Sequence, residues 1–296
     1  MNAAPVWRDM SQAELDAAYD QIKYAPNQPQ VLKRYASNSD AFRARSSAPE
    51  RIAYGGTPVE SLDVYASRVA PPSGAPINIF IHGGAWRSGL AKDYGFLAET
   101  FVRAGAHFVV PDFAWVQDTD GSLHPVTAQI RRALAWVYRH AKELGGDPER
   151  IYVSGHSSGA HLAAVLLTTD WQKDFDLPAD VIKGGLCCSG VYELTPVRLS
   201  SRNSYLKITA DVEQALSPLR NLAQVQAPLL LGYGSLETPE FQRQSLDFFA
   251  ALREAGKPVQ LLLAEGYNHF EILDTLASPY GRLGRAALAQ MRLGEG

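Results

Sequence analysis

The chain has few cysteines, little net charge and no long apolar run. Among its 296 residues there are two cysteines, Cys187 and Cys188, and they are adjacent. Adjacent thiols rarely bridge each other and two ligands make no zinc site, so we expect buried thiols in a reducing cytoplasm. The longest apolar runs, such as residues 227–231, are far too short to span a bilayer. The first residues lack a basic start followed by an apolar core, so we expect no secretory signal.

The charge balance excludes several kinds of partner. A formal net charge of −3 offers no basic face for nucleic acid and no polybasic anchor for a membrane. With 46% hydrophobic and 20% charged residues, the composition is that of an ordinary globular chain, long enough for one large α/β domain or two small ones. We therefore expect a small molecule as the partner. The oligomeric state stays open, a homo-oligomer included.

Strand-like and helix-like segments alternate from about residue 50 to the end, which is typical of a mostly parallel sheet flanked by helices. The apolar periodicity favours helices over 94–104, 126–144 and 241–255. No repeat or linker interrupts the pattern, so residues 49–296 are predicted to form a single α/β catalytic domain. The predicted strands, of which the first two form an antiparallel start, are 51–54, 61–65, 77–81, 107–111, 151–153, 182–188, 229–231 and 259–263.

Two segments do not belong to a minimal sheet of this kind. Residues 1–48 contain a helical pattern over 11–24 that begins with Ser11 and has Glu14 three positions later, a capping box. The stretch 195–222 is polar and turn-rich. Because ligands of open α/β sheets bind outside the carboxyl ends of the strands, we expect both segments to form walls of a pocket. Packing of the N-terminal helix on the back of the domain is the alternative.

The segment 151–161 is the most informative in the chain. A β-branched run breaks into Gly155-His156-Ser157-Ser158-Gly159 and then into helix-forming residues. This pattern predicts a nucleophile elbow, in which a strand turns sharply into a helix and exposes the central serine hydroxyl. The helix that begins at Ser158 would direct its free N–H groups toward a developing oxyanion.

A second glycine motif follows the predicted strand 77–81. The sequence there is His82-Gly83-Gly84-Ala85-Trp86, and glycines at a strand end allow backbone N–H groups to face a cavity. We predict an oxyanion hole built from the N–H groups of two residues among Gly83, Gly84 and Ala85, joined by that of Ser158. A plain glycine turn is the alternative, but two such motifs at two strand ends argue against it.

The base and the acid are expected late in the chain. Apart from His161, four residues after Ser157, the one histidine that follows the serine is His269, in a polar loop after the last predicted strand. In the order nucleophile, acid, histidine, the acid lies after the preceding strand, and Glu237 is the first carboxylate there. Glu240 is the alternative. Asp247 falls within the helical pattern 241–255 and is expected on its solvated face.

Together these motifs resemble the kynurenine formamidase (arylformamidase) branch of the α/β-hydrolases, near the hormone-sensitive-lipase-like esterases. The resemblance covers roughly residues 50–275 and rests on His-Gly-Gly-x-Trp, on Gly-His-Ser-x-Gly-Ala-His-Leu-Ala at 155–163 and on a closing Asn-His-Phe. It implies an α/β-hydrolase fold with an eight-stranded, mostly parallel sheet, and a triad without metal or cofactor. Ser157, Glu237 and His269 occupy the matching positions. Formamidases of this type usually have Asp where this chain has Glu237, which also fits a broader esterase-like group.

The implied reaction is hydrolysis of an ester or amide through an acyl-enzyme, with Ser157 as nucleophile and His269 as base. The candidates for an aromatic wall around the leaving group are Trp86, Trp115, Tyr192 and Tyr205, with simple packing as the alternative role of each. We expect His156 to point away from the active face, and His161 to be a buried hydrogen-bonding residue. A carboxylesterase acting on short-acyl or aromatic esters is the alternative activity, and a non-catalytic binding module is a remote one.

Overall fold

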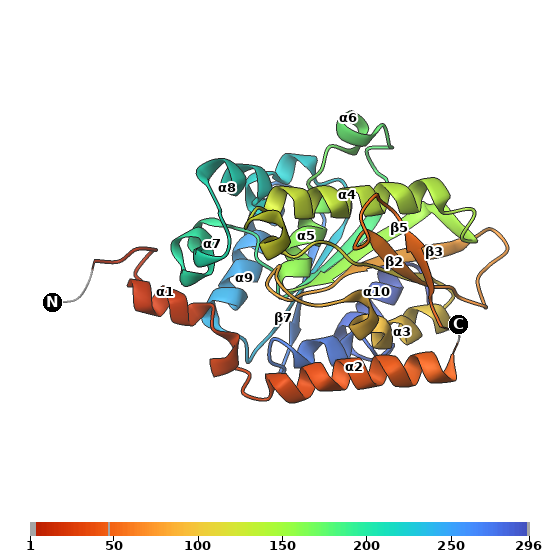
Figure 1. The fold of residues 1–296 in the computed structure, drawn as a ribbon, viewed down its shortest axis with the longest axis horizontal. Helices are drawn as coiled ribbons and strands as arrows, with labels where there is room; N and C mark the ends of the chain where they lie inside the picture. Colours follow the sequence, from red (N-terminus) through yellow and green to blue (C-terminus); the bar gives the residue numbers. More distant parts are fainter. Residues whose placement is uncertain (1–3, 47, 295–296) are drawn as a thin grey trace.

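A computed structural model describes residues 4–46 and 48–294, which form an eight-stranded sheet between two layers of helices (Figure 1). The strand order is β1-β2-β4-β3-β5-β6-β7-β8. β2 runs antiparallel to both of its neighbours, and all the other pairs are parallel. The strands are β1 (Glu50–Ala53), β2 (Ser61–Tyr65), β3 (Ala75–Ile81), β4 (His107–Pro111), β5 (Gly146–His156), β6 (Ile182–Cys188), β7 (Leu229–Gly234) and β8 (Val259–Ala264). The predicted α/β class and the predicted mostly parallel sheet are confirmed.

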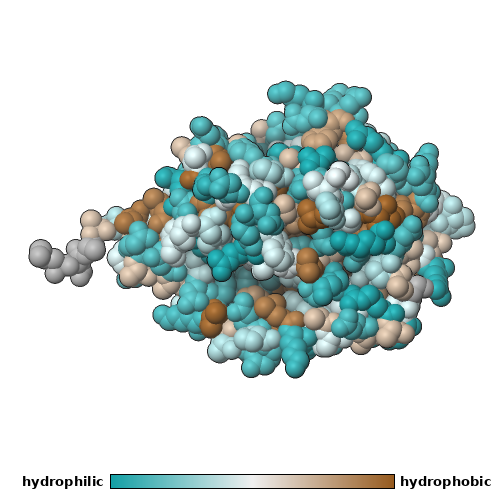
Figure 2. Space-filling view, in the orientation of Figure 1, coloured by the Kyte–Doolittle hydropathy of each residue, from teal (hydrophilic) through white to brown (hydrophobic). Residues whose placement is uncertain are grey.

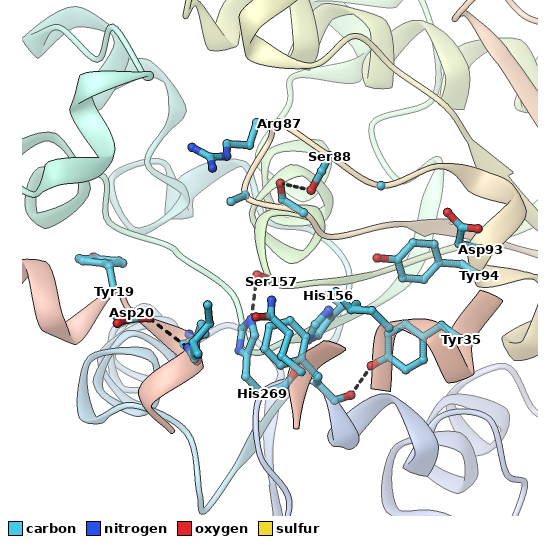
Figure 3. Close-up of a pocket in the computed structure, with 18 of the residues that line it drawn as sticks. Tyr19, Asp20, Tyr35, Arg87, Ser88, Asp93, Tyr94, His156, Ser157 and His269 are labelled. Carbon is cyan, nitrogen blue, oxygen red and sulfur yellow. Dashed lines mark hydrogen bonds between the residues drawn. The ribbon is translucent and has the colours of Figure 1, made fainter. Parts of the chain in front are cut away.

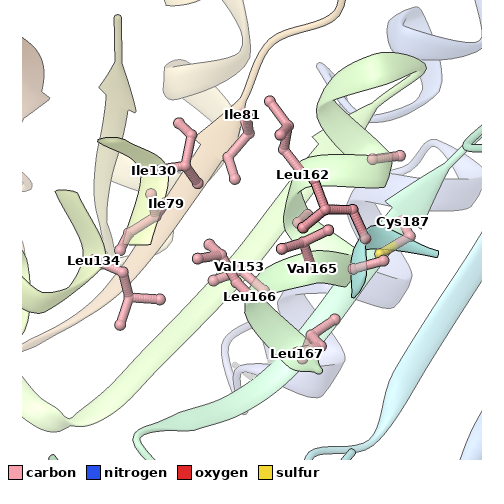
Figure 4. Packing of buried hydrophobic residues seen from close by; sticks show 14 of the residues in the cluster. Ile79, Ile81, Ile130, Leu134, Val153, Leu162, Val165, Leu166, Leu167 and Cys187 are labelled. Carbon is pink, nitrogen blue, oxygen red and sulfur yellow. The ribbon is translucent and has the colours of Figure 1, made fainter. Parts of the chain in front are cut away.

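The helices cover the sheet on both faces and create two hydrophobic cores. One core contains side chains of α4 (Leu123–His140), α5 (Ser158–Leu167) and α9 (Pro239–Glu254). The other contains side chains of α2 (Gln28–Arg45), α3 (Ala98–Arg103) and α10 (Arg282–Gln290). Strand residues alternate between the two faces. Figure 4 shows the first core, in which Ile79, Ile81 and Val153 of the strands meet Leu162, Val165 and Leu166 of α5.

Two of the predicted helices are interrupted. The pattern over 11–24 divides into α1 (Gln12–Ala18) and a short 3₁₀ helix, η1 (Gln21–Lys23), because Asp20 has an extended backbone and its carboxylate accepts from the N–H of Ile22 at 3.1 Å. The pattern over 94–104 divides into a 3₁₀ helix, η2 (Ala91–Leu97), and α3. At Gly95 in η2, a Cβ atom would meet the hydroxyl of Tyr65, so this turn packs closely on β2.

The remaining elements lie mainly around the carboxyl ends of the parallel strands. The insertion between β6 and β7 contacts the N-terminal segment, since the side chain of Gln12 donates to the carbonyl of Leu199 at 2.9 Å. The insertion comprises α7 (Thr195–Leu199), η4 (Ser201–Ser204), α8 (Ala210–Leu216), η5 (Pro218–Arg220) and η6 (Leu222–Gln224). Elsewhere lie η3 (Val116–Thr119), α6 (Trp171–Phe175) and η7 (Glu271–Thr275). The predicted boundary at residue 48 stays a prediction, and residues 1–3 and 47 of that segment lie outside the described residues.

The surface seen in Figure 2 is mostly hydrophilic, with apolar residues in small groups. Within residues 4–46 and 48–294, no helix has the length and apolar character that a membrane crossing requires.

Candidate active site

Ser157 stands between β5 and α5 in a left-handed backbone conformation, with φ 57° and ψ −124°. The turn is tight enough to require both flanking glycines. A Cβ at Gly155 would meet the backbone of Gly159, and a Cβ at Gly159 would meet the carbonyl oxygens of Ile81 and His82. The predicted strand-to-helix turn is therefore present, and it brings the serine to a cavity wall with only 8% of its surface exposed.

The side chains of Ser157, His269 and Glu237 form a continuous hydrogen-bonded chain. His269 Nε2 lies 2.9 Å from Ser157 Oγ (Figure 3), and His269 Nδ1 lies 2.8 Å from Glu237 Oε2. Glu237 follows β7 and His269 follows β8. The carboxyl ends of these two parallel strands lie at the same edge of the sheet as the elbow. The Nδ1–H group donates a hydrogen bond to the carboxylate and keeps its proton. Nε2 is therefore unprotonated and can take the proton of the serine hydroxyl.

The structure distinguishes the two candidate acids. Glu240 is buried in α9, where it pairs with Arg243 at 2.6 Å and accepts from the hydroxyl of Tyr19 at 3.1 Å. Its carboxylate is thus bound in a separate network. Asp247 pairs with Arg243 at 2.6 Å and is 34% exposed, on the solvated side of α9. Of the three carboxylates, Glu237 is the one that bonds to His269.

The His-Gly-Gly loop lies against the elbow. A Cβ at Gly83 would be 3.0 Å from the carbonyl oxygen of His156, so a glycine here lets the loop lie close to the elbow. Gly84 and Ala85 line the cavity with positive φ values of 125° and 54°. Within the described chain, the N–H groups of Gly83, Gly84, Ala85 and Ser158 have no hydrogen-bond acceptor. An oxyanion hole needs such free donors, and their role in one stays a prediction.

The structure corrects most of the expected aromatic wall. Tyr205 does line the cavity, but Trp86 and Tyr192 are fully buried in the core. The indole N–H of Trp86 donates to His161 Nδ1 at 3.2 Å, and the ring of Tyr192 stacks on Phe248 with centroids 4.4 Å apart. Trp115 is not among the lining residues, and its indole N–H donates to the carbonyl of Gly89 at 3.1 Å.

The cavity above Ser157 has a volume of about 620 Å³ and is built largely from segments that carry no motif. The N-terminal segment contributes residues 19–22 and part of α2, and the insertion contributes Arg202 and Tyr205. The Arg87 guanidinium lies 4.6 Å from the ring centroid of Tyr205, and Arg202 lies 5.2 Å from that of Tyr19. Among the described residues, neither arginine has a carboxylate within 4.0 Å. Two positive charges therefore face the cavity without an ion-pair partner.

The expectation that His156 points away from the active face is wrong. It lines the cavity, its Nε2 lies 2.6 Å from the backbone oxygen of His269, and the two rings have centroids 4.8 Å apart. Burial, with a smaller effect of His269, holds the pKa of His156 well below its usual range. The neutral ring therefore donates from Nε2 and fixes the loop that carries His269.

His161 links three parts of the site, and the expectation of a buried hydrogen-bonding residue is confirmed. Its Nδ1 accepts from Trp86 of the glycine loop, and its Nε2 donates to the carbonyl of Leu216 in the insertion at 2.8 Å. The ring is fully buried, and this burial lowers the pKa of His161 to about 4. In its neutral form the ring satisfies both partners at once.

This lowered pKa predicts a loss of stability in mild acid. Between about pH 6.5, where an unfolded histidine is half protonated, and pH 4, the unfolded chain binds a proton at His161 that the folded chain does not. The stability contributed by neutral His161 is thus present above pH 6.5 and falls as the pH falls, by about 2 kcal/mol between pH 7 and pH 5. His161→Gln should lose about 2 kcal/mol less than the original chain over this interval, measured by urea unfolding.

His124→Gln is the matched control, because it makes the same substitution at an exposed histidine that takes no part in the His161 contacts. An undiminished pH dependence in His161→Gln would contradict the assignment.

The eight-stranded sheet, the elbow and the hydrogen-bonded Ser157–His269 pair define a serine hydrolase of esters or amides with an α/β-hydrolase fold. Comparisons with known proteins agree. A family model described as the prolyl oligopeptidase family matches residues 127–279, and one described as BD-FAE matches residues 62–184. The chain belongs to the kynurenine formamidase family, in the arylformamidase and esterase branch of the α/β-hydrolases.

Two relatives and one solved structure support this assignment. The chain is 32% identical to kynurenine formamidase of Danio rerio over 281 residues, with 91% of this chain and 93% of the relative covered. It is 30% identical to kynurenine formamidase of Salmo salar, with the same coverage of 91% and 93%. A crystal structure from Silicibacter sp. TM1040, assigned as a thioesterase, has a TM-score of 0.77 at 24% identity and covers 91% of this chain and 97% of its own. At that identity it supports the fold alone.

Proposed function

We propose that the protein is an arylformamidase-like hydrolase that removes a small acyl group from an arylamine, with formyl as the preferred acyl group. The observation that carries this proposal is the hydrogen-bonded chain from Glu237 through His269 to Ser157 at the wall of a 620 Å³ cavity. Its similarity to two kynurenine formamidases over 91% of the chain supports the substrate class.

The proposed reaction has two halves. In the first, Ser157 Oγ bonds to the formyl carbon while its proton passes to His269 Nε2 and the carbonyl π electrons move onto oxygen. The N–H groups of Gly84, Ala85 and Ser158 stabilise this oxyanion. The tetrahedral intermediate then collapses, the C–N bond breaks, and His269 returns the proton to the departing amine. In the second half a water molecule repeats the sequence and releases formate from the serine.

The carboxylate of Glu237 fixes the imidazole in the tautomer that this sequence needs. With Nδ1 bonded to Glu237, His269 presents an unprotonated Nε2 to the serine, and the negative charge stabilises the imidazolium that forms during attack.

Turnover of N-formylkynurenine beside p-nitrophenyl acetate tests the proposal. A kcat/KM for the formyl amide well above that for the ester supports an arylformamidase. The reverse ratio supports a carboxylesterase of short-acyl esters. Glu237 favours this second candidate, because formamidases of this type usually have Asp at the matching position. A chain that turned over neither compound would contradict both.

The two unpaired arginines at the cavity suggest how the amine product is held. N-formylkynurenine carries a carboxylate at its amino-acid end. The guanidinium of Arg87 packs on the ring of Tyr205 and has no carboxylate partner in the described chain, so it can bind this group. Arg87→Gln should raise KM for N-formylkynurenine about tenfold, the effect of one lost charge-assisted hydrogen bond. It should leave the kinetics with neutral p-nitrophenyl acetate nearly unchanged. Arg87 is preferred to Arg202 for this test because Arg202 also donates to the carbonyl of Tyr19 at 2.9 Å.

Arg253 serves as the matched control, since it rests on the ring of Phe249 at 5.9 Å and does not line the cavity. Arg253→Gln should alter KM for neither substrate. An equal rise of KM for both substrates in Arg87→Gln would contradict recognition of a carboxylate.

We also propose that the enzyme acts in the cytoplasm on a small molecule, without nucleic acid or membrane as a partner, as a monomer or a homo-oligomer. Cys187 and Cys188 support a reducing compartment because both are buried, unpaired thiols. The net charge of −3 is in keeping with the absence of a polyanionic partner.

A further inference from the structure

Ser189, the first residue after β6, has a left-handed backbone with φ 54° and is completely buried. Serine seldom adopts this conformation, which favours glycine. Its N–H donates to the carbonyl of Gly232 at 2.7 Å, so hydrogen bonding to β7 continues one residue beyond the end of β6. Close to the cavity, Ser157, Ala85 and Trp86 also have positive φ values.

The hydroxyl of Ser189 donates to Glu237 Oε1 at 2.6 Å. The N–H of Gly234 donates to the same oxygen at 2.6 Å, while His269 Nδ1 bonds to Oε2 at 2.8 Å. The carboxylate of Glu237 is only 1% exposed, so these donors replace the water that would otherwise solvate its charge. Both oxygens of the acid are thereby assigned to fixed partners.

The end of β6 also holds the nucleophile. The carbonyl of Cys188 accepts from the N–H of Ser157 at 2.9 Å, and the next residue, Ser189, binds the acid. Two consecutive residues therefore contact opposite ends of the Ser157–His269–Glu237 chain. The left-handed turn at Ser189 lies between these two contacts.

We propose that Ser189 is a positioning residue of the hydrolase, which orients the carboxylate of Glu237 toward His269. This inference rests on the proposed triad. A glutamate side chain has one more rotatable bond than aspartate, so its carboxylate has more orientations to lose. The hydroxyl of Ser189 and the N–H of Gly234 hold Oε1, and Oε2 then faces the imidazole. Ser189 does not line the cavity, so it acts through Glu237 and not on the substrate.

Ser189→Gly tests this role, because glycine removes the hydroxyl and accepts the positive φ without strain. We expect kcat to fall about tenfold, as the loss of a hydrogen bond to a charged group would cause, while KM stays within twofold. The melting temperature should change little, because relief of the positive φ offsets the lost hydrogen bond to the buried carboxylate. A merely structural serine would leave kcat intact, whatever the change in melting temperature. Ser245→Ala, which removes another fully buried hydroxyl in α9, should leave kcat unchanged.

A double-mutant cycle with Glu237→Asp provides the second readout. The aspartate carboxylate is one methylene shorter and cannot hold both Ser189 and His269 at the present distances. Adding Ser189→Gly to Glu237→Asp should therefore lower kcat by much less than tenfold. Full kcat in Ser189→Gly, or two losses that simply multiply, would overturn the positioning role. The place of Glu237 in the proposed triad fails if Glu237→Gln keeps its turnover, so the two failures can be distinguished.

Discussion

Ser157→Ala is expected to lower kcat for either test substrate by at least about 10⁴-fold. The variant lacks the oxygen that forms the acyl bond, whereas the donors of Gly84, Ala85 and Ser158 and the cavity remain. Only the catalysis contributed by binding and by the oxyanion hole should survive. Rates are compared at saturating substrate, and the melting temperature establishes that the variant is folded.

Ser154, on the same strand three residues before the nucleophile, provides the control. Its hydroxyl accepts from the side chain of Asn78 at 2.8 Å within the core. Ser154→Ala should cost some stability but leave kcat within about threefold, since it contacts no reacting group. Undiminished hydrolysis by Ser157→Ala would contradict the acyl-enzyme mechanism as a whole.

The strands could be predicted from the sequence because buried parallel strands read as short, nearly continuous apolar runs. β6 lies at the predicted residues, 182–188, and β2 at 61–65. The helices were predicted less well at their ends. Asp20 ends a helical pattern by capping Ile22, and Gly95 is placed by its contact with Tyr65. Such interruptions depend on side-chain contacts that periodicity does not contain.

The three residues of the hydrogen-bonded chain, Ser157, His269 and Glu237, could be predicted because each follows the end of a strand. The two glycine motifs and His269 are local in sequence, and the fold brings strand ends together at one edge of the sheet. The cavity wall could not be predicted in the same way. It is formed by α2, η1 and the insertion, which are distant in sequence and meet only after folding.

The direction in which a side chain points could not be predicted from its place in the sequence. Trp86 follows the glycine loop directly, yet its φ of 59° and its bond to His161 place the indole in the core. Ser189 shows the converse. It contacts the acid but belongs to no motif, so only its position after β6 in three dimensions reveals it.

Glu237→Gln is expected to lower kcat by about 10³- to 10⁴-fold, although glutamine has nearly the same size. Ser189 and Gly234 both donate to Oε1, so the amide oxygen of glutamine must occupy that place. The amide NH₂ group then faces His269 Nδ1 and donates to it. This forces the imidazole proton onto Nε2, where the ring can no longer accept the proton of Ser157.

Glu240→Gln is the matched control in the neighbouring network and should have the opposite signature. Glu240 pairs with Arg243, whose guanidinium would lose a buried partner, so the melting temperature should fall. The kcat measured well below that temperature should stay within a few fold, because Glu240 does not contact His269. If instead Glu240→Gln abolished turnover and Glu237→Gln preserved it, the acid would be Glu240, and the hydrogen bonds around Glu237 would be structural.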